Sequence, residues 1–394
     1  MTIKIKILLF LSFLLLTSLL VVNFSQAETL SNDFNNGTEN INIEDKGIED
    51  ISFKAEVLEI LEEERKTLDS DREVVQQKLK LKGLEEPFFD KEIIFNGIGN
   101  LDVLNSKVYQ VGDKVIMVSS YGPEGEEFFY ILDYVRSGSL WYLLIIFFIL
   151  LVIIGRFTGF RSFLSLALSF LVIVKFIIPQ ILNGSNPLLI TVIGSIIVLL
   201  IVIYLTEGFG AKSHIAVISI FFSLLITVFF STLFVNLAKL SGAASEEVLF
   251  LFNFQGTMIN LRGLLLAGII IGALGALDDI VVSQISTCRE IAKANRNLSY
   301  KELYKRTYKV GVSHIASMTN TLFLAYAGAS LPLLILFASG QSVFTSWQQA
   351  LNTELVATEI IRTLTGSIGI IMSVPIATGL AAWYYSKKNI VSKS

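Results

Sequence analysis

Residues 261–284 read LRGLLLAGIIIGALGALDDIVVSQ. The run is almost free of charge and is long enough for a membrane-spanning helix, which needs about 20 mostly apolar residues to cross hydrocarbon. Two adjacent aspartates, Asp278 and Asp279, interrupt it near one end. A segment that is apolar enough for lipid and yet carries two carboxyl groups indicates both the fold class and the place to look for a site.

Further apolar runs surround this one, and 53% of the chain is hydrophobic while 16% is charged. This composition predicts an α-helical polytopic membrane protein. We expect seven spans after residue 138, at about 139–155, 161–182, 187–206, 213–238, 261–284, 314–338 and 359–384.

Charge is distributed unevenly along the chain. Residues 28–137 carry 12 basic and 25 acidic side chains, whereas residues 138–394 carry 17 basic and 9 acidic ones. Basic residues favour cytoplasmic loops, so the acidic part is expected outside the cell membrane and the C-terminus in the cytoplasm. Because the positive charge is spread over membrane loops, nucleic acid is a poor candidate partner.

The N-terminal part divides into three segments. Residues 1–27 have two lysines, an apolar core and a closing Ser25-Gln26-Ala27, as in a secretory signal peptide; an uncleaved membrane anchor is the alternative. Residues 28–50 are polar and acidic and predict a disordered linker. Residues 51–137 alternate in apolar and polar residues and predict a small all-β domain outside the membrane, a barrel or sandwich of about five strands.

Neither half of the chain offers a recognisable catalytic or metal motif. The β-domain has no histidine and no cysteine, and Cys288 is the one cysteine of the chain, so no disulfide can form within it. We therefore predict a protein that is not an enzyme and that needs no metal or cofactor. The β-domain is expected to bind or assemble partners. The segment 62–82 is either a short helix or a charged hairpin.

The segment 285–313 of the membrane domain is rich in lysine and arginine, alternating with Leu298, Leu303, Tyr304 and Tyr308. This pattern predicts a basic inner loop containing an amphipathic helix that lies on the inner leaflet, where basic side chains meet anionic head groups.

Three glycines share a helix face with Asp279, at separations of four, seven and eleven residues. They are Gly275, Gly272 and Gly268, and the last two form a GxxxG step. Small residues allow a second helix to approach closely, so this face is expected to pack against protein and to direct Asp279 into the bundle.

A charged aspartate at the centre of a membrane helix costs about 2.5–3.5 kcal/mol on insertion scales, and two adjacent ones repel each other. The pair lies about 25 Å along the helix from Leu261, in the inner third of the membrane. Binding a proton or a cation would relieve the repulsion, and His314, Ser317 and Asn320 of the next span are expected at the same depth. The alternative is that the carboxylates touch water or cap a neighbouring helix.

Three further charges fall in the outer half of the expected spans. Glu359 and Arg362 are three residues apart on one helix face and predict an ion pair. Lys175 can lie in an apolar span because its long side chain extends the ammonium group toward the head groups; a role in an outer gate is the alternative.

The runs LRGLLLAGIIIGALGALDDIVVSQ, VGVSHIASMTNTLFLAYAGASLPLL and ELVATEIIRTLTGSIGIIMSVPIATGLAA, together with LDYVRSGSLW before them, resemble the YibE/F-like family of bacterial membrane proteins. The resemblance covers most of residues 52–385 and implies a multi-pass protein of the bacterial cell membrane.

A second motif is similar to one in a membrane half of resistance-nodulation-division pumps and of the SecD/SecF translocation factors, and the similarity concerns the mechanism. Gly275-x-x-Asp278-Asp279, followed by Arg289-Glu290, carries this similarity. It implies that the two aspartates carry protons.

Two hypotheses of function follow. In the first, the chain is a proton- or cation-coupled transporter or export component that uses the Asp278–Asp279 pair, alone or with a second membrane subunit or as a homo-oligomer. In the second, it is an envelope scaffold whose β-domain binds partner proteins and whose polar membrane residues lock helices together.

Overall fold

The computed structural model describes residues 51–67, 73–99, 108–121, 126–244, 248, 259–339 and 346–391. The chain forms two compact units, Met1–Ile149 and Leu150–Ser394. The segments 1–27 and 28–50, for which we expect a signal peptide or anchor and a linker, lie outside the described residues.

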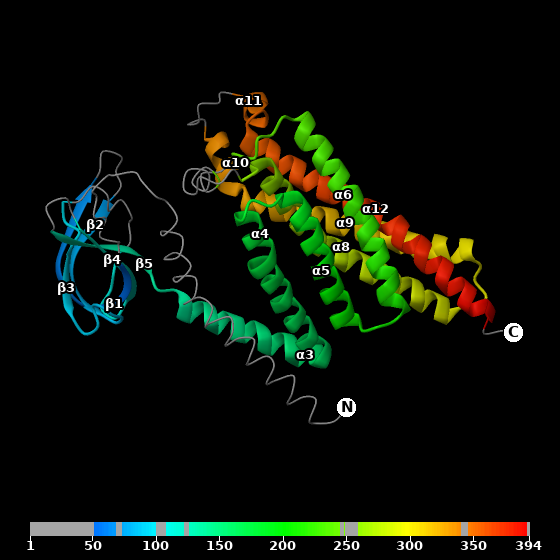
Figure 1. Cartoon of the computed structure of the whole chain (residues 1–394), viewed down its shortest axis with the longest axis horizontal. Helices are drawn as coiled ribbons and strands as arrows, with labels where there is room; N and C mark the ends of the chain where they lie inside the picture. Colours follow the sequence, from blue (N-terminus) through cyan, green and yellow to red (C-terminus); the bar gives the residue numbers. More distant parts are fainter. Residues whose placement is uncertain are drawn as a thin grey trace. The chain divides into compact units, whose positions relative to one another are not determined.

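The first unit contains one antiparallel sheet. Its strands follow the order β3-β2-β1-β4-β5, and the sheet curls into half of a barrel (Figure 1). The prediction of a small β-domain with about five strands is confirmed, although the sheet is neither a closed barrel nor a sandwich. The strands are β1 Ile51–Thr67, β2 Glu73–Gly83, β3 Glu92–Asn96, β4 Lys114–Tyr121 and β5 Glu127–Tyr134.

In the charged segment 62–82, residues 62–67 lie in β1 and residues 73–82 lie in β2, which pairs antiparallel with β1, so these residues form strands and not a helix. Glu59 lies opposite Lys80, and Glu62 lies opposite Lys78. Opposite charges that face each other across an antiparallel pair stabilise the register, and this explains why so polar a segment forms a strand.

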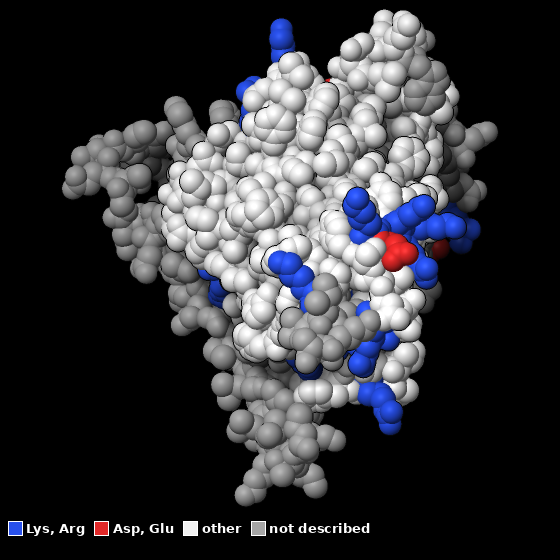
Figure 2. Space-filling model, turned by 90° about the vertical axis from the view of Figure 1, so that its right-hand side faces the viewer, with Lys and Arg blue, Asp and Glu red and all other residues white. Residues whose placement is uncertain are grey.

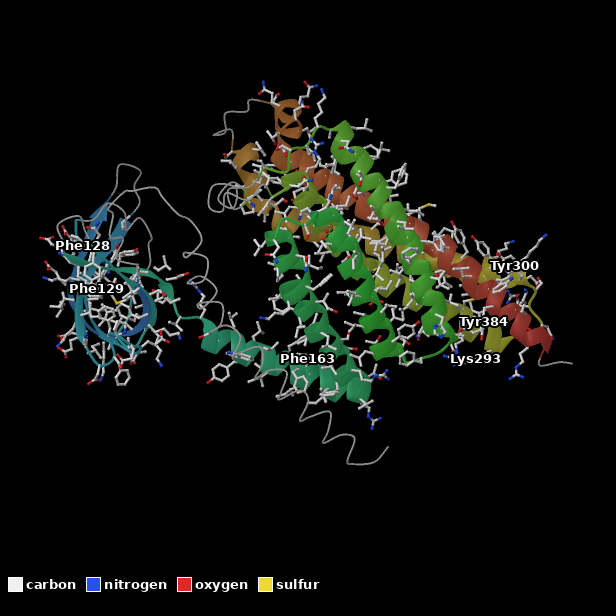
Figure 3. The ribbon with its side chains drawn as sticks, viewed as in Figure 1. Phe128, Phe129, Phe163, Lys293, Tyr300 and Tyr384 are labelled. Atoms are coloured by element: carbon white, nitrogen blue, oxygen red, sulfur yellow. The ribbon has the colours of Figure 1, made fainter. Side chains whose placement is uncertain are left out.

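Apolar side chains alternate along the strands and meet on the concave side of the sheet. Phe53 and Val57 of β1 and Leu79 of β2 are at most 1% exposed. The ring of Phe53 lies 4.3 Å from that of Phe88, and Phe129 of β5 packs edge-on against both. Phe128, the next residue along β5, points away from this core and is exposed (Figure 3).

The side chain of Gln77 on β2 forms hydrogen bonds with the backbone of Tyr109, in the segment before β4. Its amide oxygen accepts a hydrogen bond from the Tyr109 N–H at 2.8 Å, and its amide nitrogen donates to the Tyr109 carbonyl at 3.1 Å. Both residues are buried. The Gln77 side chain therefore satisfies both backbone groups of Tyr109, which lies outside the strands of the sheet.

The second unit is helical. The helices are α3 Ser137–Val172, whose first residues belong to the first unit, η1 Ile173–Ile177, α4 Ile178–Leu182, α5 Pro187–Glu207, α6 Ala211–Leu237, α8 Leu261–Ala294, α9 Tyr300–Ala329, α10 Leu331–Ala338, α11 Trp347–Leu351 and α12 Glu354–Val391. In the described part of the chain five helical stretches are long and apolar enough to cross a membrane, or six if α9 and α10, bent by 65°, count as one.

The expected number of seven spans is not confirmed. The segments 139–155 and 161–182, expected as two spans, lie in one helical stretch, Ser137–Leu182, in which two helices meet at a kink without a loop between them. Arg156 adopts φ 52° and ψ −130° and kinks it, so a single residue replaces the loop that we expected. No proline separates the two apolar runs, and the helix resumes at once after the kink.

Small and polar residues allow α6, α8, α9 and α12 to pack closely (Figure 1). Ser219, Ser223 and Thr227 repeat every four residues on α6, are fully buried, and donate to carbonyls one turn earlier at 2.7–3.0 Å. Each hydroxyl is thus satisfied within its own helix. Gly369 of α12 lies directly against Thr227, where a Cβ atom would collide with the hydroxyl. Close approach without an unpaired polar group is what an apolar solvent requires.

The basic segment 285–313 joins two long helices, and no separate helix lies between them. Helix α8 continues to Ala294, and α9 begins at Tyr300 with a capping box between Ser299 and Glu302. Cys288, Leu303 and Thr307 are fully buried in this hairpin. Of the apolar residues that we expected to face lipid, Leu298, Leu303 and Tyr304 pack in the same cluster as residues of α8 and α12, whereas Tyr308 is exposed.

Gln284 joins the three helices at the base of the hairpin. It is fully buried, and its amide nitrogen donates to the Thr307 carbonyl at 2.9 Å and to the Thr378 hydroxyl at 2.8 Å. One side chain of α8 is thus bonded to both α9 and α12.

We predict that Gln77→Leu destabilises the sheet by about 2 kcal/mol, because two buried backbone groups lose their partners. Hydrogen exchange of strand β4 in the full chain should become faster by a factor of roughly 30. Gln110→Leu, at an exposed neighbouring position, is the control and should leave exchange unchanged. Equal exchange in the two variants would contradict the role given to Gln77.

Replacing Gln284 by the similarly sized methionine should destabilise the helical unit by about 0.6–1.7 kcal/mol, the range measured for hydrogen bonds between membrane helices. The measurement is the unfolding equilibrium in mixed detergent micelles. Gln348→Met on α11, which is exposed, should have no effect. A Gln284→Met protein as stable as the wild type would show that the bonds to α9 and α12 contribute nothing.

Candidate functional site

Asp278 and Asp279 lie in the middle of α8 and, as consecutive helical residues, point about 100° apart. The Asp278 side chain is half-buried, and its Oδ1 atom is inaccessible and has no hydrogen-bond partner among the described residues. Asp279 is exposed on the described part of the bundle. The two carboxyl groups therefore have different surroundings.

Asp278 lines a cavity of about 470 Å³ between α3, η1, α5 and α8. The walls are mainly aliphatic, and hydroxyl groups lie among them. The lining residues with polar side chains are Ser162, Ser165, Ser169, Ser195, Thr206 and Asp278. Ser195 is 1% exposed, and its hydroxyl also has no hydrogen-bond partner in the described structure.

Two further acidic groups act on Asp278. Asp279 and Glu207, at the end of α5, both repel its negative charge. Glu207 is itself paired with Lys212, its carboxylate lying 2.5 Å from the ammonium group. Asp278 therefore lies half-buried beside a second carboxylate, which favours the binding of a proton or a cation.

The expected partners on α9 do not reach the aspartates. His314 is half-buried with an unpartnered Nδ1 atom, whereas Ser317 and Asn320 are exposed among the described residues. In the described structure no hydrogen bond or ion pair joins any of the three to Asp278 or Asp279. Helix α9 packs against α8, but this packing forms no bond between these three side chains and the aspartates in the described structure.

The glycine face of α8 is mostly open. A Cβ atom added at Gly268 or Gly275 would have no neighbour within 4 Å, whereas at Gly272 it would lie 2.5 Å from the Tyr326 hydroxyl of α9. The predicted close helix contact is therefore present only at Gly272 in the described part of the chain. Gly275 instead forms part of the cavity wall beside Asp278.

The three charged residues expected in the outer half have different surroundings. Glu359 and Arg362 form the predicted ion pair on α12, at 3.5 Å, and the guanidinium lies 5.9 Å from the Tyr326 ring. Lys175 is exposed and lies on η1, a π-helical turn. Ile173 and Ile177 of the same turn line the Asp278 cavity. The widened turn thus shapes one wall of the site.

The hairpin of α8 and α9 forms a basic end of the helical unit. Figure 2 shows the lysines and arginines gathered there, and Figure 3 places Lys293, Tyr300 and Tyr384 at this end. Tyr300, Tyr304 and Tyr308 follow one another along α9, the last two stacked at 5.6 Å. The exposed basic residues are Arg289, Lys293, Arg296, Lys301, Lys305, Arg306 and Lys309.

Metal binding finds no support in the part of the chain that the structure describes, where no group of three or more His, Cys, Asp or Glu side chains converges. The hydroxyl residues of the cavity were not singled out from the sequence. A signal for them existed, because Ser162, Ser165 and Ser169 are spaced to share one face of α3. That signal does not say which helix this face meets.

Comparison with known proteins gives one positive result. Residues 143–387 match the family model described as YibE/F-like protein. None of the curated proteins and none of the solved structures matches the chain. The match covers more than half of the chain and includes α5, α6, α8, α9 and the whole cavity lining. The chain belongs to the YibE/F-like family of membrane proteins.

Proposed function

We propose that this YibE/F-like protein is a proton- or cation-coupled transporter or export component in which Asp278 is the exchanging group. The observation that carries the proposal is the unpartnered, buried Asp278 Oδ1 atom at the wall of a partly open cavity. A buried carboxylate without a protein partner is costly, and a mobile proton or cation offsets that cost. Intramembrane carboxyl groups of this kind commonly serve ion pathways.

Asp279 has a secondary role in this proposal. It lies outside the cavity lining but adds negative potential at Asp278. The sequence expectation of a shared site with His314, Ser317 and Asn320 receives no support from distances, so these three residues have no part in the exchange step.

The exposed polar residues support a partner in the membrane. Asp279, Ser317 and Asn320 face away from the described helices. A charged aspartate facing lipid would cost about 2.5–3.5 kcal/mol, and a second copy of the chain or another membrane subunit that covers it removes that cost. The bias of basic residues supports a cell-membrane orientation with the β-domain outside and the C-terminus in the cytoplasm. Catalysis has no part in the proposal.

A scaffold role is the second candidate, and the edge of the sheet favours it. Phe128, Tyr130 and Leu132 of β5 are between 40% and 58% exposed, alternate along the strand, and share one face. β5 is the last strand in the sheet order, so a partner strand could pair with it. In this role the membrane aspartates would contribute packing alone.

The test is proton flux across proteoliposomes that contain the full chain. Asp278→Asn keeps the size and hydrogen bonding of the side chain but removes the titrating charge. We expect it to reduce flux by at least about tenfold, the effect of about 1.4 kcal/mol. Asp279→Asn should reduce flux less, because it changes only the potential at the site.

Glu290→Gln is the matched control, since it is an exposed acid on the same helix, paired with Lys293. It should transport as the wild type does. If Asp278→Asn protein is present at normal amounts and retains full flux, transport through Asp278 is excluded. Loss of function on replacing Phe128, Tyr130 and Leu132, with Asp278→Asn still active, would favour the scaffold.

A further inference from the structure

The Asp278 cavity is much larger than a proton or a bare ion requires. At about 470 Å³ it lies within the range of roughly 300–1,000 Å³ that small-molecule sites occupy. A site for a metal cation would surround it closely with six or so oxygen atoms. The volume therefore points to an organic molecule as the occupant.

The walls limit the chemistry of that molecule. Most of the lining is aliphatic, and one side chain, Asp278, carries a charge. No lysine or arginine is among the lining residues, and Asp279 adds negative potential, so the site favours a cation over an anion. The aliphatic residues are Leu166, Ile173, Ile177, Val198, Leu199, Val202, Ile271 and Leu274.

A second polar side chain lines the cavity from another helix. Ser195 of α5 lines the same cavity, is 1% exposed, and has a hydroxyl with no partner in the described structure. Buried hydroxyls in proteins are nearly always hydrogen-bonded. Ser195 therefore adds a polar group to the wall of the cavity that Asp278 also lines.

We propose that the cavity between α3, α5 and α8 binds a small organic cation, with its ammonium group on the half-buried Asp278 carboxylate and its apolar body against the aliphatic walls. The proposal rests on the proposed function, since the cation and a proton would then compete for the same carboxylate. Binding of one releases the other, and this couples their movements.

The probe is the 2-phenylethylammonium ion, and its neutral isostere is propylbenzene, which replaces the ammonium group by a methyl group. Binding to the purified full chain in lipid nanodiscs is measured by equilibrium dialysis at pH 7, with sodium chloride as a further competitor. We expect the ammonium ion to bind at least about tenfold more tightly than propylbenzene, because a charge-assisted pair with Asp278 forms only with the cation. Sodium should not displace it.

Two glycines of α8 provide matched variants. Gly275 lines the cavity, and Gly268 lies two turns away on the same helix outside the lining; both have open space at the Cβ position. Gly275→Leu places a side chain in the cavity and should lower binding at least about tenfold, as should Asp278→Asn. Gly268→Leu should bind as the wild type does. Size-exclusion profiles establish that all three variants are folded.

The outcomes separate the two proposals. Equal binding of propylbenzene, displacement by sodium, or binding that survives Gly275→Leu would overturn the organic-cation site. If the ammonium ion does not bind but proton flux still depends on Asp278, the cavity inference fails and the proposed function stands. If the ion binds through Asp278 but no variant alters proton flux, the site stands and coupled transport is excluded.

Discussion

Hydrocarbon offers no partner to a hydrogen-bonding atom, and this constraint organises the helical unit. The backbone meets it by forming helices, and most polar side chains meet it within the protein. Ser219, Ser223 and Thr227 of α6 bond to carbonyls one turn earlier, the Gln284 amide nitrogen bonds to α9 and α12, and Glu359 pairs with Arg362. Polar groups satisfied in this way hold helices together.

Asp278 and Ser195 both keep a buried oxygen atom unpaired, as do Gln284 and several other described residues of the helical unit. They come from different helices and line one cavity, and Asp278 is the acidic residue of its lining. The π-helical turn η1 and the open Gly275 both contribute to its walls. A site that costs folding energy in this way is expected where function requires it.

Much of this architecture could be predicted from the sequence, because long apolar runs and alternating strands have strong local signals. The runs at 187–206 and 213–238 correspond to α5 and α6, and the strands appear where apolar and polar residues alternate. The loop between the first two expected spans could not be predicted correctly, since the change of direction occurs at Arg156 alone. For the segment 285–313, the same periodicity suits a lipid surface and a protein surface equally well.

The candidate site could be predicted only in part. The aspartate pair is visible because charges are rare in apolar runs, and Asp278 does lie at a cavity. Its neighbours could not be found, because a sequence shows which residues share a helix face but not which helix that face meets. His314 and Asn320 were chosen by depth, whereas Ser165 and Ser195 line the cavity from α3 and α5.

Chemical labelling of Asp278 tests the central claim most directly. Dicyclohexylcarbodiimide, an apolar reagent, reaches carboxyl groups in apolar cavities, whereas water-soluble carbodiimides reach those open to water. In the full chain in lipid, mass spectrometry should find the apolar adduct on Asp278 and little adduct from the water-soluble reagent, with labelling suppressed by 2-phenylethylammonium. Rapid labelling of Asp278 by the water-soluble reagent, unaffected by the ammonium ion, would contradict the account.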